Sequence, residues 1–115
     1  MELELRSKKI WLYDGIVDFR KSIDGLSLLV SEQLKASQME AIFLFFNRRR
    51  DKVKVLAWHG NGFILLYKRL ERGRFSMSER QGEVVLDNRQ LSWLLAGLDW
   101  EKMTNWKQLG YEDFY

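Results

Sequence analysis

Lysine and arginine side chains are concentrated in one third of the sequence, and their type and spacing suggest chemistry more clearly than any other residues. Residues 48–80 contain ten of the 19 basic residues but only three of the 16 acidic ones, a net charge of +7. The rest of the chain carries −4, which gives the whole its net charge of +3. A basic block on a mildly acidic chain is typical of an anion-binding surface.

Nucleic acid is the anion that this block fits best. Arginine binds phosphate through paired N–H donors and stacks on nucleobases, and residues 68–75 interleave four basic residues with Gly and Phe. Basic residues mixed with aromatic ones on a sheet are typical of nucleic-acid surfaces. The alternative interpretation is a solvated charged edge that discourages strand aggregation. The candidate DNA-binding residues are Arg48, Arg49, Arg50, Lys52, Lys54, Lys68, Arg69, Arg72 and Arg74.

Catalytic and metal-binding patterns are weak in comparison. The chain has no Cys and one His, His59, which lies beside a predicted turn with no acid within four residues. Asp14, Asp18 and Asp24 are spaced like carboxylates for metal-assisted phosphoryl transfer, but each lies next to Gly or at a helix cap, where Asp is common for local reasons. No Ser lies in a nucleophile-elbow pattern. We therefore expect no catalytic residues, no metal site, no cofactor and no enzymatic activity.

The elements that position the basic block follow from hydrophobic periodicity. Short apolar runs predict strands, and apolar residues at three- and four-residue spacing predict amphipathic helices. The predicted strands are 9–13, 41–46, 52–58 and 63–68, with weaker ones at 74–77 and 83–86. One predicted helix covers about 23–36. Another helix is predicted to begin after Asp87, because Asp87 and Gln90 together resemble a capping box. The predicted core face of this helix is Leu91, Leu94, Leu95 and Leu98.

These elements predict a single α+β domain over residues 1–99, with a mostly antiparallel sheet of four to six strands and two helices packed on one face. Residues 100–115 form an aromatic-rich C-terminal tail that is too apolar for a solvated linker, so we expect it to dock on the domain or on a partner. The N-terminus is too acidic for a signal peptide. No apolar run approaches the roughly 20 residues of a membrane span. A cytoplasmic protein without membrane contact is expected.

A hairpin joins the two halves of the basic block. A two-residue turn at Asn61-Gly62 places Lys54 opposite Arg69, and like charges directly across a ladder are destabilising unless an anion lies between them. The alternative turn, Gly60-Asn61, shifts the register and breaks this pairing. The more apolar face of the hairpin is the expected core face, and it carries Val53, Val55 and Ala57.

Several segments together resemble the TnpB accessory protein, or Orf-two-like protein, of insertion-sequence-sixty-six-type transposable elements. The resemblance covers about residues 9–100, and Lys68–Phe75 is its most specific part. His59 stands where members often carry an acid, and the prolines usual before the first sheet hairpin and after Phe75 are missing. The segments are Gly15–Lys21, Ile23–Leu26, Phe45–Lys54, Trp58–Phe63, Tyr67–Phe75 and Leu94–Trp100.

The resemblance implies a bacterial mobile-element protein encoded beside a separate, larger transposase that carries the cutting and joining chemistry. It carries over no catalytic residue. The implied role is a non-enzymatic accessory factor of DNA transposition, with DNA bound through the basic residues and the cognate transposase as a second partner. The alternative is a module that docks on the transposase without contacting DNA. Its candidate contact residues are Trp58, Tyr67, Trp100 and Trp106.

Overall fold

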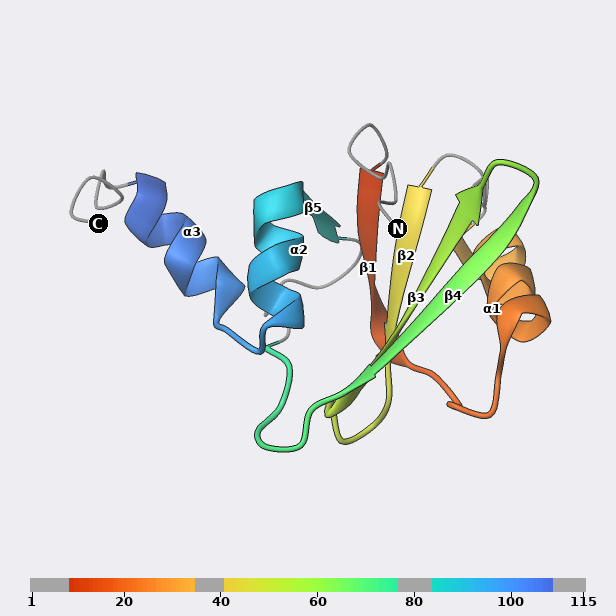
Figure 1. The fold of residues 1–115 in the computed structure, drawn as a ribbon, viewed down its shortest axis with the longest axis horizontal. Coiled ribbons are helices and arrows are strands. Elements are labelled where there is room, and N and C mark those ends of the chain that lie inside the picture. The colour runs from red at the N-terminus through yellow and green to blue at the C-terminus, as the bar shows by residue number, and fades with distance from the viewer. Residues whose placement is uncertain (1–8, 35–40, 77–83, 109–115) are drawn as a thin grey trace.

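One mixed sheet organises residues 9–34, 41–76 and 84–108, which the computed structural model describes. Its strand order is β4-β3-β2-β1-β5 (Figure 1). The strands are β1 (Lys9–Ile16), β2 (Ala41–Phe46), β3 (Lys52–His59), β4 (Gly62–Arg69) and β5 (Val84–Leu86). The helices are α1 (Ile23–Leu29), which continues as a π-helical stretch over Val30–Leu34, α2 (Asn88–Leu95) and α3 (Trp100–Gln108). Only β1 and β2 pair in parallel within the described residues, so the predicted α+β class with a mostly antiparallel sheet is confirmed.

The middle strand, β2, is apolar at every position, and all six of its residues are buried. Successive side chains of a strand point to opposite faces of the sheet, so β2 contributes to two separate hydrophobic clusters. A strand that is apolar throughout is typical of a sheet covered on both faces. Ile42, Leu44 and Phe46 belong to one cluster, and Ala41, Phe43 and Phe45 belong to the other.

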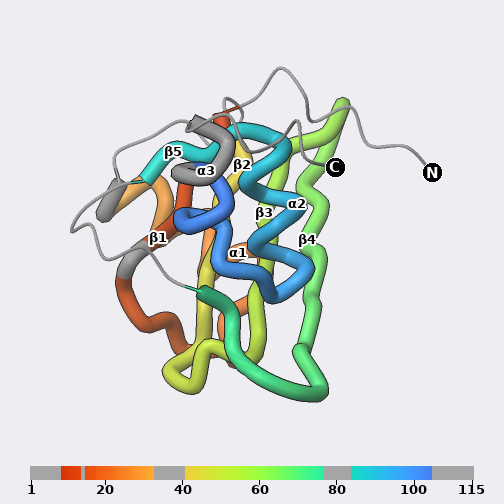
Figure 2. Tube along the Cα trace, turned by 90° about the vertical axis from the view of Figure 1, so that its left-hand side faces the viewer, coloured from red at the N-terminus to blue at the C-terminus, as the bar shows by residue number. Residues whose placement is uncertain are grey.

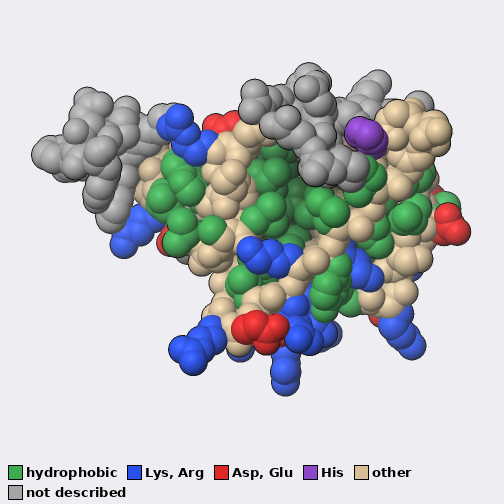
Figure 3. All heavy atoms as spheres, viewed as in Figure 1, with side chains coloured by type: hydrophobic (Ala, Val, Ile, Leu, Met, Phe, Trp, Pro, Cys, Tyr) green, Lys and Arg blue, Asp and Glu red, His purple; other side chains and the backbone are tan. Residues whose placement is uncertain are grey.

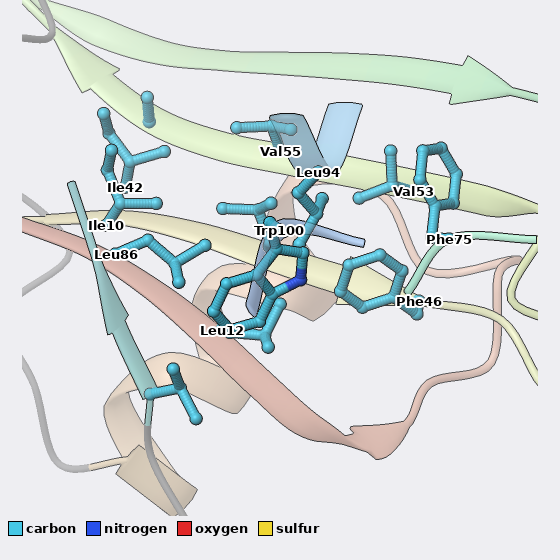
Figure 4. Close-up of a cluster of buried hydrophobic side chains, with 13 residues drawn as sticks. Ile10, Leu12, Ile42, Phe46, Val53, Val55, Phe75, Leu86, Leu94 and Trp100 are labelled. Carbon is cyan, nitrogen blue, oxygen red and sulfur yellow. The ribbon is translucent and has the colours of Figure 1, made fainter. Parts of the chain in front are cut away.

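The helices accordingly cover both faces of the sheet. In Figure 1 the sheet stands between α2 and α3 on the left and α1 on the right, and Figure 2 looks from the side on which α2 and α3 are nearest. Leu26 and Val30 of the α1 side pack in one cluster. Leu94 and Trp100 pack in the other, which Figure 4 shows in detail. The prediction that two helices pack on one face was wrong, because either face left bare would expose half of the apolar side chains of β2.

Helix α2 begins and ends at local signals in the sequence. The predicted capping box is present: the Gln90 N–H donates to Asp87 Oδ1 at 2.8 Å, and the Asp87 N–H donates to Gln90 Oε1 at 2.9 Å. At the other end Gly97 has a φ of 80°, and the N–H groups of residues 97 and 98 bond back to the carbonyls of residues 94 and 93. This is a Schellman motif. It ends the helix before Leu98, which is 43% exposed, so its predicted place in the core was wrong.

The other predicted elements agree with the structure except at their ends. The predicted helix 23–36 is confirmed as helical through residue 34, and its last two residues lie outside the described residues. The first strand does not end at Asp14-Gly15 but continues to Ile16, with an irregularity in its pairing after Leu12. The weak strand at 83–86 is confirmed over Val84–Leu86 as β5, and its first residue lies outside the described residues. Residues 74–76 are not a strand, and the last residue of that prediction is not described.

The β3–β4 hairpin uses the turn that was the alternative. Its central residues are Gly60-Asn61, so Lys54 pairs with Tyr67 rather than with Arg69. Gly60 has a φ of 62°, and a positive φ at the first central residue is the requirement of a type II′ turn. Each residue of β3 therefore pairs with a β4 residue two positions earlier than in the preferred prediction. Because a shift of two positions does not change the face of the sheet, every side chain keeps its predicted face. The predicted core face, Val53, Val55 and Ala57, is therefore confirmed.

Trp100 ties the start of α3 to the body of the protein. Its side chain is 3% exposed, and its Nε1–H donates to the Ser76 carbonyl at 2.9 Å. A tryptophan that satisfies its N–H while its rings are buried contributes strongly to packing. The side chain of Trp106 lies outside the described residues. Within the described ranges, no helix is long and apolar enough to cross a membrane.

We predict that Leu94→Ala lowers the free energy of unfolding by about 2–5 kcal/mol, because it empties a fully buried site between α2 and the sheet. Leu98→Ala is the matched control. Its side chain is 43% exposed, so its effect should stay within about 0.5 kcal/mol. Urea denaturation followed by circular dichroism measures both. Equal losses in the two variants would show that the core does not end where the helix does.

Candidate nucleic-acid interface

Three connections meet at one end of the sheet. β1 runs parallel to β2, and β3 is antiparallel to both of its neighbours, β2 and β4. β1, β2 and β4 therefore all run in the same direction. The segments that follow β1, β2 and β4 therefore leave the sheet at the same end, which is the lower end in Figure 1. The segments are 17–22, the turn 47–51 and the loop 70–75. Figure 3 shows Lys and Arg side chains gathered there.

The turn 47–51 is built around Asn47. Its Nδ2–H donates to Asp51 Oδ1 at 2.6 Å, and its Oδ1 accepts from the Lys52 N–H at 3.0 Å. The Asn47 bond is also the main reason why the pKa of Asp51 is lowered, since it stabilises the carboxylate. Arg50 has a φ of 59°, a left-handed conformation that costs about 1–2 kcal/mol for a residue with a Cβ. Such a turn holds its shape only because neighbouring groups fix it.

The loop 70–75 supplies that support. The Leu70 N–H donates to the Asp51 carbonyl at 2.7 Å, and the Phe75 N–H donates to the Arg50 carbonyl at 2.6 Å. Phe75 itself is 2% exposed and packs against Phe46, with 5.8 Å between ring centroids. Two backbone bonds and one buried ring thus join the loop to the turn as a single unit.

This unit, together with Lys52 and Arg69, is here named the basic end. Lys52 pairs with Arg69 across the ladder, so a like-charge pair exists, although with Lys52 in place of the predicted Lys54. Arg69 also bonds to Glu71 at 3.1 Å, which raises the pKa of the arginine. Five arginines of the turn and the loop are exposed, and the described residues give none of them an ion-pair partner. They are Arg48, Arg49, Arg50, Arg72 and Arg74.

Two of the nine predicted residues are engaged within the fold instead. Lys54 Nζ donates to the carbonyls of Phe19 and Lys21 at 2.8 and 2.7 Å and lies 5.0 Å from the centroid of the Phe19 ring. Lys68 Nζ donates to the Leu95 carbonyl at 2.6 Å, where a cation satisfies the end of a helix. These lysines point to opposite faces of the sheet. The basic end therefore brings together seven of the predicted residues.

Sequence reasoning missed two basic residues at the same end, Arg20 and Lys21. They follow β1, and only the parallel pairing of β1 with β2 brings them to the end of the sheet from which the turn 47–51 leaves. Arg20 forms a two-pronged ion pair with Asp18, with a shortest contact of 2.7 Å. Its hydrogen bonds lower the pKa of Asp18 to about 2. No local pattern in the sequence signals this position.

The predicted partner-binding residues lie in different surroundings. Trp58 is half-buried near the hairpin turn and packs edge-on against Phe63, at 5.0 Å between centroids. Tyr67 is on the same face but at the other end of the hairpin, and 53% of it is exposed. Trp100 packs inside the protein, which leaves it little surface for a partner. For Trp106 the described side chains give no location.

Acidic and histidine side chains do not assemble into a site where they are described. Over these residues, no group of three or more His, Cys, Asp or Glu side chains is placed to hold a metal ion. His59 is exposed beside the hairpin turn, and Asp24 is exposed in the first turn of α1. Asp18 is held by Arg20. The side chain of Asp14 lies outside the described residues.

The fold and the site define a small α+β protein with one strongly basic end. Comparison with known proteins is specific: the family model of the IS66 Orf2 like protein matches residues 8–105, so the chain belongs to this family. The resemblance predicted from the sequence is confirmed. Membership gives the chain an accessory role in the transposition of IS66-type insertion sequences, in a family not known for catalysis.

Two relatives support the assignment. The chain is 37% identical over 94 residues to the uncharacterized protein y4hO of Sinorhizobium fredii. The aligned residues cover 80% of this chain and 82% of the relative. It is 35% identical over 100 residues to the uncharacterized protein y4jC of the same organism, and the aligned residues cover 85% of this chain and 86% of the relative. No solved structure matches the chain.

The ion pair at the edge of the basic end gives a prediction on pH. Arg20→Ala should raise the pKa of Asp18 from about 2 toward its ordinary value of 3.8, because the guanidinium supplies the main hydrogen bonds to the carboxylate. Lys21→Ala should raise it less, since Lys21 acts only through its charge. Titration of the Asp18 carboxyl carbon by NMR measures both.

The sign of the effect on stability follows from the lowered pKa. The pair stabilises the folded state above the unfolded-state pKa near 3.8, and this contribution is lost as the pH falls through about 2. An Asp18 titration midpoint that Arg20→Ala leaves unchanged would contradict the ion pair as its cause.

Proposed function

We propose that this protein is a non-enzymatic accessory factor of DNA transposition that binds DNA phosphates through the basic end, in the bacterial cytoplasm. The observation that carries the proposal is the joining of the turn 47–51 to the loop 70–75 by two backbone hydrogen bonds. These bonds hold five exposed arginines from two distant segments on one surface. Family membership supports the context, since transposition acts on DNA.

The charge balance of the basic end favours a phosphate ligand. Seven basic residues share a small region in which Asp51 and Glu71 are the nearby acids. Such a density of like charge repels itself, and the repulsion is relieved when phosphates occupy the space between the side chains. Arginine also suits this role better than lysine, because its planar fork meets two phosphate oxygens at once.

Docking on the cognate transposase is the second candidate function. It is favoured by apolar side chains that remain exposed on the α2 side of the sheet. Leu66 of β4 is 46% exposed, and Leu98 after α2 is 43% exposed. Exposed large apolar side chains are candidates for contact with a protein partner. Co-purification of the transposase with the wild-type chain, and its loss in Leu66→Glu, tests this function separately from DNA binding.

The salt dependence of DNA affinity tests the leading function. If about five phosphates are neutralised, log affinity should fall against log salt concentration with a slope near −4.5. Replacement of Arg48, Arg49 and Arg50 by Ala should make the slope shallower by up to about 3. The fold should remain, because these three side chains are exposed. Fluorescence anisotropy with a labelled duplex and a labelled single strand, at several salt concentrations, gives the slopes.

Lys9→Ala is the control for this measurement. Lys9 is exposed at the start of β1, at the opposite end of the sheet from the basic end. Its removal also lowers the net charge but should leave the slope unchanged. The proposal fails if neither DNA binds at low salt, or if the triple arginine variant keeps the full slope. Docking on the transposase then becomes the better account.

A further inference from the structure

An exposed aromatic ring lies beside the basic end. Tyr67 of β4 is 53% exposed, and it lies in the second half of that strand, where residues 66–69 are all exposed. It points to the α1 side, the same face as the Lys52–Arg69 pair. We propose that Tyr67 stacks on an unpaired DNA base, so that this protein binds single-stranded DNA in preference to duplex. This inference rests on the proposed function, because the arginines hold the backbone of the same strand.

The ring of Tyr67 is supported from one side by Phe19. Their ring centroids are 6.2 Å apart, with the planes tilted by 59°. Phe19 is itself fixed by Lys54, whose Nζ binds the Phe19 carbonyl and lies 5.0 Å from the ring centroid. Lys54 thus contributes to the site as a positioning residue. The tyrosine ring is held in place before any ligand arrives, which lowers the ordering cost of binding.

The charges next to Tyr67 suit the phosphates on either side of a stacked base. Arg69 is two residues along β4 on the same face, about 7 Å away at the rise of an extended strand. Lys52 is directly opposite Arg69, and Arg20 lies on the segment that carries Phe19. Arg69 and Arg20 form exposed ion pairs with Glu71 and Asp18, which are weak enough for a phosphate to compete with them. A platform of this kind, an aromatic ring bordered by basic side chains, is typical of proteins that bind single strands without reading their sequence.

The ring distinguishes unpaired from paired DNA for a steric reason. In a duplex both faces of an interior base are already stacked on neighbouring bases, so a side chain reaches a base face only at an end or after unstacking. A single strand offers its base faces freely. The arginines, in contrast, bind phosphates in either form of DNA. Loss of Tyr67 should therefore weaken single-strand binding selectively.

Anisotropy titrations of the full chain with a labelled mixed-sequence single strand and with the corresponding duplex test the proposal. Tyr67→Ala should weaken single-strand binding roughly tenfold or more. The affinity for the duplex should change less than about twofold, and the salt slope for the duplex should stay the same. Tyr67→Phe should retain wild-type affinity, because it keeps the ring. Val85→Ala is the matched control: it removes an exposed apolar side chain from β5, at the opposite edge of the sheet, and should change neither affinity.

A photochemical cross-link gives a readout that does not require a variant to fold. A single strand containing 5-iodouracil, irradiated on the wild-type protein, should yield a peptide adduct at Tyr67. An adduct only at other residues, or equal losses of single-strand and duplex binding in Tyr67→Ala, would overturn the inference. Duplex binding with the expected salt slope but no dependence on Tyr67 would leave the proposed function standing alone. Failure of the wild-type chain to bind either DNA would overturn both.

Discussion

The burial of every side chain of β2 is the constraint on which the rest of the structure depends. Six consecutive apolar residues in the middle of the sheet require cover on both faces. Helices α1 and α2 provide it from opposite sides, and the buried side chains of the described core are all apolar. Charged groups are thereby displaced to the ends of the sheet. The basic end is a consequence of this arrangement, since the turn after β2 and the loop after β4 leave the core together.

The same core holds the charges in place. Phe75 is buried against Phe46, the last residue of β2, and its backbone N–H fixes the left-handed Arg50. Burial of a phenylalanine side chain stabilises the fold by about 1.5–3 kcal/mol, which is enough to offset a strained residue and part of the repulsion between arginines. Lys54 and Lys68 stabilise the fold on opposite faces of the sheet by hydrogen bonds to backbone carbonyls. Lys54 binds the segment after β1, and Lys68 binds the end of α2.

Local patterns predicted most elements of this fold, and contacts between distant segments account for the errors. The apolar runs, the Asp87–Gln90 capping box and the basic block are all visible in a few adjacent residues. The placement of the helices on two faces depends on what covers β2, and the roles of Lys54 and Lys68 depend on carbonyls about 30 residues away. Arg20 joins the site only through the parallel pairing of β1 and β2. The hairpin register was missed because both Gly60 and Gly62 allow a tight turn.

The central claim is that the turn 47–51 and the loop 70–75 act as one DNA-binding surface. An NMR titration of the labelled chain with a short DNA duplex, following each backbone amide, tests it most directly. We predict that the amides of residues 48–52 and 69–75 shift together and give one dissociation constant, while Lys9 and the hairpin tip at Gly60-Asn61 do not shift. Shifts confined to one of the two segments, or centred on the hairpin tip or on α2, would contradict the claim.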